Sequence, residues 1–223
     1  MDTSADHAGT FEFSAPLEFV RWYVADGWLN YVVGEELMRG YSTGDNAGCF
    51  GPYDDITRGQ VAVILYRAKC AKNPSLIEEY GSSIDPSDYA WSREFKDMMG
   101  GTYYTAAVNW AKATGIMTGD ADTGYTTVRP DDPVARQELC LMLARYANGG
   151  TVPSVTLDPV KAQGILGMDE VADWARDSVY WAVNNGAIGG VNNGNGIFSM
   201  DPTGKTWRSA AAKMFTVVMR NAM

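Results

Sequence analysis

The sequence predicts a mainly α fold in which three similar helix–turn–helix units pack around an approximate threefold axis. Three segments carry the same landmarks in the same order: an aromatic residue, a glycine nine positions later, then a proline and an arginine. The arginine stands six positions after the proline in every segment. The landmarks are Tyr31, Gly40, Pro52 and Arg58; Trp110, Gly119, Pro130 and Arg136; Trp181, Gly190, Pro202 and Arg208. One such helix pair cannot bury both of its apolar faces, whereas three pairs sharing a core can.

Each unit is expected to start with a helix around its aromatic residue and to end with a second helix after its arginine. Apolar residues stand three, six and seven positions after the arginine, as Val61, Ile64 and Leu65 do in the first unit. This is the spacing of one buried helical face. The glycine-rich stretches STGDNAG, DADTG and NNGNG lie between the two helices and consist of residues that tolerate left-handed backbone.

The repeats divide the chain of 223 residues into units and connectors that share one core. We expect an N-terminal tail at 1–12, repeats at 13–72, 95–148 and 165–223, and polar, irregular connectors at 73–94 and 149–164. We also expect three similar clefts between neighbouring units. The hydrophobic content of 46% is enough for such a core.

The acidic composition narrows the possible partners. Lys and Arg number 18 against 27 Asp and Glu, which gives a net charge of -9. Nucleic acids and anionic membranes are therefore repelled on average, and an anionic ligand must be held locally. No apolar run approaches the roughly 18 residues of a membrane span, and the opening MDTSADHAGTFEF lacks the pattern of a signal peptide. We expect no nucleic-acid partner and no membrane insertion.

Cysteine and histidine are too few for most of their usual chemistry. Three cysteines without a CxxC motif indicate neither a zinc site nor a disulfide framework, and Cys140 stands among apolar neighbours like a core residue. Whether Cys49 and Cys70 pair is left open. The single histidine, His7, lies in the polar tail, which argues against catalytic triads. The stretch DADTGYTTVRPD lacks two acidic positions of a calcium loop and is interpreted as a turn, so we expect no metal and no cofactor.

Arg58 opens its predicted helix, where a cation beside the positive end of the helix dipole is unfavourable. Thr57 and Gln60 have the spacing of an N-terminal capping box. The free backbone N–H groups of this turn could bind an anion, the guanidinium would add a bidentate donor for a carboxylate, and Gly59 would let a ligand approach the backbone. The alternative is that each arginine pairs with an acidic residue of its own loop. Those residues are Asp54, Asp55, Asp131, Asp132 and Asp201.

The aromatic residues have two interpretations, core filling or flat platforms for sugar rings. Trp110 and Trp181 have apolar neighbours at helical spacing, which favours the core, with a ring edge reaching a cleft. Trp22, Tyr103 and Trp174 open their helices and are evenly balanced between the two interpretations.

These motifs resemble the S-layer homology domain family, in which three tandem copies are usual. The best copies are CFGPYDDITRGQVAVILYR and FKDMMGGTYYTAAVNWAKATGIMTG. The resemblance implies a three-pronged, pseudo-trimeric α-helical module, secreted to the bacterial cell wall or S-layer and expected to be monomeric in isolation. It also implies a partner, a secondary cell-wall polysaccharide or peptidoglycan-linked glycan, often pyruvylated, that is bound in the clefts.

The resemblance further implies that Arg58, Arg136 and Arg208 hold the acidic group of that polymer. The other candidate ligand-binding residues are Thr57, Gly59, Gly40, Gly119, Gly190, Trp110, Trp181, Tyr103 and Trp174. The sequence departs from the family's ITRAE motif, most of all in the third unit, where Trp207, Ser209 and Ala210 surround the arginine. We therefore expect the Arg58 site to be the best preserved and the third site to be altered or silent.

The leading hypothesis is a non-enzymatic carbohydrate-binding anchor, and two alternatives stay open. A wall hydrolase would use two carboxylates, but the acidic residues lie mostly in turns or at helix ends, where capping explains them. Its candidates would be Glu35, Glu36, Asp97, Glu138 and Asp173. The second alternative is a protein-interaction or structural scaffold whose degenerate repeats bind no ligand.

Overall fold

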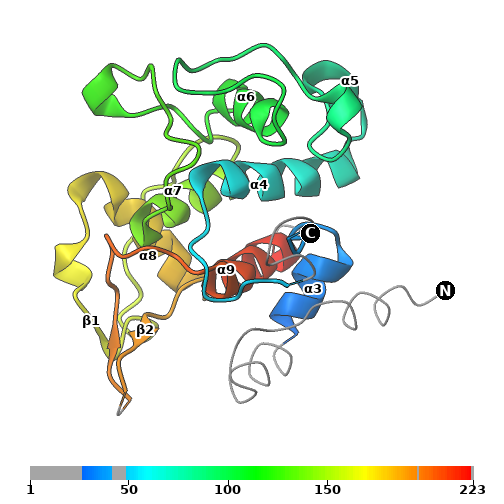
Figure 1. Cartoon of the computed structure of the whole chain (residues 1–223). Helices are drawn as coiled ribbons and strands as arrows, with labels where there is room; N and C mark the ends of the chain where they lie inside the picture. Colours follow the sequence, from blue (N-terminus) through cyan, green and yellow to red (C-terminus); the bar gives the residue numbers. More distant parts are fainter. Residues whose placement is uncertain (1–26, 42–48, 195, 222–223) are drawn as a thin grey trace.

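The computed structural model describes residues 27–41, 49–194 and 196–221 and confirms a mainly α fold (Figure 1). The tail at 1–12, Trp22 and the turn STGDNAG lie outside the described residues. The helices are α3 (Trp28–Gly34), α4 (Arg58–Lys72), α5 (Ser75–Tyr80), α6 (Thr105–Ala113), α7 (Arg136–Ala147), α8 (Arg176–Asn184) and α9 (Arg208–Asn221). Short 3-10 turns η1 to η4 cover Pro86–Asp88, Ala121–Thr123, Met168–Glu170 and Asp173–Ala175.

The three main helix pairs join different units. Helix α6 of the second unit packs on α4 of the first, α8 of the third packs on α7 of the second, and α3 of the first packs on α9 of the third. Figure 1 shows this exchange, with α3 near the start of the described chain beside the C-terminal α9. The first helix of each unit thus completes the core of its neighbour.

Three backbone hydrogen bonds close a ring where the three units meet. The N–H of Ile56 donates to the carbonyl of Thr206 at 2.9 Å, that of Thr206 to Val134 at 3.1 Å, and that of Val134 to Ile56 at 2.9 Å. All three residues are fully buried. Each unit contributes one residue and makes the same contact, so the arrangement is approximately threefold, as predicted.

The predicted apolar faces form the core. The residues three, six and seven positions after each arginine are all buried; they are Val61, Ile64, Leu65, Leu139, Met142, Leu143, Ala211, Met214 and Phe215. Trp110 packs between Tyr66 and Tyr146, with ring centroids 5.5 and 6.4 Å apart.

Two local elements differ from the sequence expectation. The connector at 73–94 contains helix α5, whose Leu76 is buried. The Tyr66 hydroxyl lies 2.8 Å from the carbonyl oxygens of both Leu76 and Gly81, so its single proton can be donated to either end of this helix. In the third unit a small sheet of order β1-β3-β2 forms from Ile165–Leu166, Val191–Asn192 and Phe198–Ser199. Strand β3 pairs parallel to β1 and antiparallel to β2.

Candidate functional site: three arginines between the units

The three repeated arginines lie in equivalent places between neighbouring units. In each, the Nε–H donates to the backbone carbonyl two residues before the next unit's proline: Arg58 to Val128 at 2.8 Å, Arg136 to Met200 at 2.8 Å, and Arg208 to Phe50 at 2.9 Å. Their exposed fractions are only 8%, 6% and 5%. Each arginine therefore joins two units.

The turn that begins each of these helices is occupied by backbone from the next unit. The N–H of Arg58 donates to the Asp132 carbonyl at 3.0 Å, and that of Gly59 to the Pro130 carbonyl at 2.7 Å. The Arg136 and Arg208 turns make the same contacts. The predicted capping box is present, since Thr57 Oγ1 accepts from the N–H of Gln60. These bonds correct the expectation of a free anion site at the helix start.

Gly59 makes room for protein backbone. A Cβ at this position would lie 2.9 Å from the Pro130 carbonyl oxygen and 3.4 Å from the Tyr104 ring. The space that the sequence assigned to a ligand is thus filled by the second unit. Gly119 and Gly190 have positive φ values of 89° and 82°, which glycine adopts without strain, so their role is to form the turns in which they lie. A Cβ on Gly119 would lie 2.8 Å from the Tyr125 carbonyl oxygen.

The Arg58 guanidinium is neutralised by carboxylates of the second unit, not by its own loop. Its Nη1 lies 2.9 Å from Glu138 Oε1, and its Nη2 lies 3.9 Å from Asp120 Oδ1. Arg129 binds the same two carboxylates, at 2.9 Å to Asp120 and 3.2 Å to Glu138. Burial alone would raise the pKa of Asp120, but its hydrogen bond to Arg129 and the charges of Arg58 and Arg129 outweigh burial and hold it below its usual value.

The sequence interpretation missed Asp120 and Arg129 and considered Glu138 only as a hydrolase acid. The signal was present in the repeats, because Asp120 directly follows Gly119 and Glu138 stands two positions after Arg136. Asp132 also lies 3.5 Å from Arg129, so the cluster holds two arginines and three carboxylates, and neither arginine lacks a counter-charge.

The Arg208 guanidinium is satisfied by uncharged groups of the first unit. Its Nη2 donates to the Arg39 carbonyl at 2.8 Å and its Nη1 to Gln60 Oε1 at 3.5 Å. The guanidinium carbon lies 4.9 Å from the centre of the Phe50 ring and 5.2 Å from that of Tyr41, within the range of cation–π attraction. Burial lowers the pKa of Arg208.

Arg136 differs from both, because its two Nη atoms have no hydrogen-bond or ion-pair partner in the part of the chain that the structure describes. The third unit has Val191 and Ala210 where the second has Asp120 and Glu138. Burial lowers the pKa of Arg136, with Cys140 and Asp201 opposing that effect more weakly. In the described chain, the buried side-chain polar atoms that lack a hydrogen-bond partner are Thr206 Oγ1 and Ser209 Oγ. The Nη atoms of Arg136 lack a partner but are not among these buried atoms, so they are accessible to solvent.

The candidate aromatic residues divide between core and surface. Trp110 is 2% exposed, which confirms the core interpretation and makes its ring inaccessible to a sugar. Trp181 packs against the core and borders a cavity of about 110 Å³ with Ala147, Asn185, Val218 and Asn221. Tyr103 is 37% exposed beside Thr57 and Gln60, and Trp174 is 56% exposed. Gly40 is half-buried next to Tyr41.

Other chemistry finds little support in the described ranges. They contain no group of three or more His, Cys, Asp or Glu side chains placed to hold a metal ion. None of their helices is long and apolar enough to cross a membrane. Cys49, Cys70 and Cys140 are free thiols, and burial raises the pKa of Cys140 to about 12.

The fold and the site define a class of protein, an α-helical module built from repeats with an equivalent arginine between each pair of units. Residues 94–140 match the family model of the S-layer homology domain. This match supports the resemblance inferred from the sequence for the second unit, and it does not extend over the first and third units. Domains of this family anchor proteins to cell-wall polymers, so the expected localisation at the bacterial cell surface is also confirmed.

Two curated proteins are similar over 189 residues. The chain is 23% identical to an amylopullulanase of Thermoanaerobacterium thermosulfurigenes and 22% identical to the exoglucanase XynX of Acetivibrio thermocellus. Both alignments cover 85% of this chain but only 9% and 15% of those proteins, respectively. The chain thus spans a small part of the length of the relatives that it matches.

Proposed function

We propose that the protein is a non-covalent cell-surface anchor that binds an acidic, pyruvylated secondary cell-wall polysaccharide, and that Arg136 holds the acidic group. The observation that carries this proposal is the Arg136 guanidinium, which is nearly buried and has no carboxylate within 4 Å in the described chain. A pyruvate ketal would present a planar carboxylate, which suits a guanidinium because two parallel N–H···O bonds can form.

Charge compensation favours Arg136 over Arg58. A polymer carboxylate at Arg58 would have to displace Glu138 or lie beside it and Asp120, and like charges at such distances repel strongly in a partly buried site. At Arg136 the ligand would supply the missing counter-charge. This order places Arg136 ahead of Arg58, which the sequence had ranked first, because the degenerate third unit lacks counterparts of both acidic residues that neutralise Arg58.

Arg208 is a weaker candidate for a different reason. Both of its Nη atoms already donate to protein oxygens, and two aromatic rings cover the guanidinium. A ligand there would break existing hydrogen bonds, whereas at Arg136 it would add new ones. We therefore expect one acidic group to bind per chain.

The decisive experiment adds a carboxylate beside Arg136 and leaves the arginine in place. Ala210→Glu puts an acid at the position that Glu138 occupies next to Arg58. We expect it to weaken co-sedimentation with purified cell-wall sacculi at least tenfold, about 1.4 kcal/mol. Arg136→Gln should have a similar effect, since it removes the charge.

The matched control is Gln60→Glu, which adds the same acid at the equivalent position beside Arg208. Wall binding should be unchanged in this variant. In a separate test of the ligand, removal of pyruvate from the sacculi should abolish binding of the unmodified protein. If Ala210→Glu binds the wall as well as the unmodified chain does, Arg136 is not the ligand site.

A structural scaffold is the second candidate, and the interlocked contacts of Arg58 and Arg208 favour it for those two positions. It predicts no wall binding, or wall binding that depends on none of the three arginines. A catalytic role has less support because four of the five candidate acids, Glu36, Asp97, Glu138 and Asp173, have structural partners. Asp97, for example, accepts hydrogen bonds from the N–H groups of Val128 and Arg129 at 2.7–3.1 Å. Release of reducing sugar from purified wall would instead indicate a hydrolase.

A further inference from the structure

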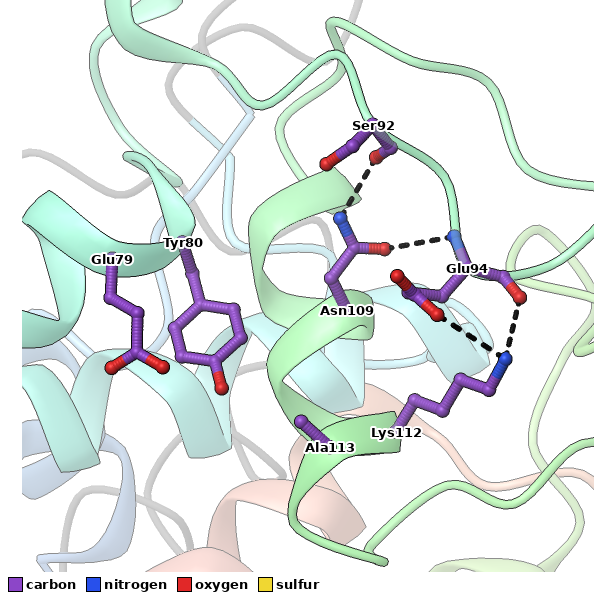
Figure 2. A pocket seen from close by; sticks show the side chains of 7 residues that line it. All are labelled: Glu79, Tyr80, Ser92, Glu94, Asn109, Lys112 and Ala113. Carbon is purple, nitrogen blue, oxygen red and sulfur yellow. Dashed lines mark hydrogen bonds and ion pairs between the residues drawn. The ribbon is translucent and has the colours of Figure 1, made fainter.

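A polar cavity of about 460 Å³ lies between α5, α6 and the segment that leads into the second unit (Figure 2). None of the three repeated arginines borders it. Its lining residues are Glu79, Tyr80, Ser92, Glu94, Asn109, Lys112 and Ala113. The volume falls within the usual range of small-molecule sites.

The side of the cavity formed by Ser92, Glu94 and α6 is held in place by hydrogen bonds within the protein. Asn109 is 6% exposed, and its side-chain amide donates to the Ser92 carbonyl at 2.8 Å and accepts from the N–H of Glu94 at 3.2 Å. Lys112 Nζ donates to the Glu94 carbonyl at 2.7 Å and lies 3.4 Å from its carboxylate. These bonds hold the segment to α6, so binding would require little further ordering.

The groups left for a ligand are mostly hydrogen-bond acceptors. Figure 2 shows the Glu79 carboxylate beside the Tyr80 hydroxyl on one side and the Glu94 carboxylate on the other, with the Tyr80 ring turned toward α6. Burial and the neighbouring Glu79 raise the pKa of Tyr80, which therefore stays a neutral phenol. The Ser92 hydroxyl has no partner among the described side chains and backbone.

The charges exclude an acidic ligand. Glu79 and Glu94 face the cavity against the single cation Lys112, which is already paired with Glu94. A ligand carboxylate would meet like charges, whereas hydroxyl groups can donate to carboxylates in short, charge-assisted hydrogen bonds. The half-buried Tyr80 ring offers an apolar face for C–H groups. A compact, uncharged polyol with one apolar face fits the hydrogen-bond acceptors, the negative charge and the aromatic ring of this cavity.

We propose that this cavity binds an uncharged pyranose sugar, with the Tyr80 ring against its C–H face and Glu79 and Glu94 accepting hydrogen bonds from its hydroxyls. The site is independent of Arg136 and takes a ligand of different charge, so the two proposals fail separately. A chain with both sites would contact acidic and neutral sugars.

Amide chemical shifts of the full 15N-labelled chain test this site directly. Titration with methyl β-glucoside or N-acetylglucosamine should shift signals near Tyr80, Glu94 and Asn109, with a dissociation constant on the order of 1 mM. Ala113→Arg should weaken this binding at least tenfold, because the new side chain fills an exposed wall of the cavity and removes no packing. Ala71→Arg is the matched control, since Ala71 is an exposed alanine in the last turn of α4 and borders neither this cavity nor the one beside Trp181.

Three outcomes would overturn the proposal: no localised shifts with either neutral sugar, equal binding by the Ala113→Arg variant, or tighter binding of glucuronate. A preference for glucosamine over N-acetylglucosamine would reassign the cavity to cations. Tyr80→Phe should retain binding and Tyr80→Leu should lose it, because only the first keeps the aromatic face. Wall binding through Arg136 should be unchanged in the Ala113→Arg variant.

Discussion

At the scale of single residues, equivalent positions in the three units carry different side chains, and some of these differences leave a buried hydroxyl without a hydrogen-bond partner. On the central ring the first two units contribute Ile56 and Val134, whereas the third contributes Thr206. The Thr206 hydroxyl is buried and has no partner in the described chain. An orphaned buried hydroxyl costs free energy that a methyl group of the same shape would not.

Thr206→Val should therefore increase the free energy of unfolding by about 1–2 kcal/mol, because valine has the same shape as threonine and already occupies the equivalent position in the second unit. Urea denaturation measures this gain. Thr216→Val is the matched control, since the Thr216 hydroxyl is buried but donates to the Ala212 carbonyl at 2.8 Å, so that variant should gain nothing. A loss of stability in Thr206→Val would mean that the hydroxyl has an unrecognised partner.

Local chemistry was predictable from the sequence at this scale, and contacts between units were not. The capping box of Thr57 and Gln60 depends on residues three positions apart, so its spacing was enough to predict it. The partners of Arg58 depend on which unit lies next to it, and Asp120 and Glu138 are distant in sequence. Sequence spacing therefore located each arginine at its helix start but could not assign its counter-charge.

At the scale of helices, the three arginine helices begin with the same backbone contacts but different caps. Helix α4 has Thr57 at its N-cap, whereas α7 has Ala135, which offers no side-chain acceptor. The backbone is suited to a cap in both, with φ and ψ of -89° and 161° at Thr57 and -71° and 152° at Ala135. Glu138 already accepts from the N–H of Ala135 at 2.9 Å, which is half of a capping box.

Ala135→Thr should complete this box and stabilise the chain by about 0.5–1.5 kcal/mol. The matched control is Ala135→Val, which adds the same branched shape without the hydroxyl. Thermal unfolding of the two variants separates the contribution of the cap from that of the added methyl groups. Equal stability of the threonine and valine variants would show that no capping bond forms.

The helices themselves were predicted well, whereas their partners were not. Apolar spacing identified the buried faces of α4, α7 and α9, because burial of one face follows from helical periodicity. The same pattern cannot say which helix covers that face. Helix α5 was missed because its six residues contain a single buried side chain, Leu76, which is too short a pattern to distinguish from a polar connector.

At the scale of the whole molecule, the exchange of helices means that no unit has a core of its own. Helix α3 of the first unit packs on α9 of the third, near the other end of the chain, and the three units close a cycle. Linear repeat proteins unfold in steps, because each repeat touches only its neighbours along the chain. A closed cycle has no terminal repeat, so its units should fold together.

A chain that ends at residue 150 tests this closure. It would lose α9 as the partner of α3, the Met200 carbonyl that Arg136 binds, and Thr206 from the central ring. We expect the full chain to unfold in one transition with equal calorimetric and van't Hoff enthalpies, and the truncated chain to show no cooperative transition. A truncated chain that melts cooperatively would show that two units form a core without the third, and the cycle would then add stability without being required for folding.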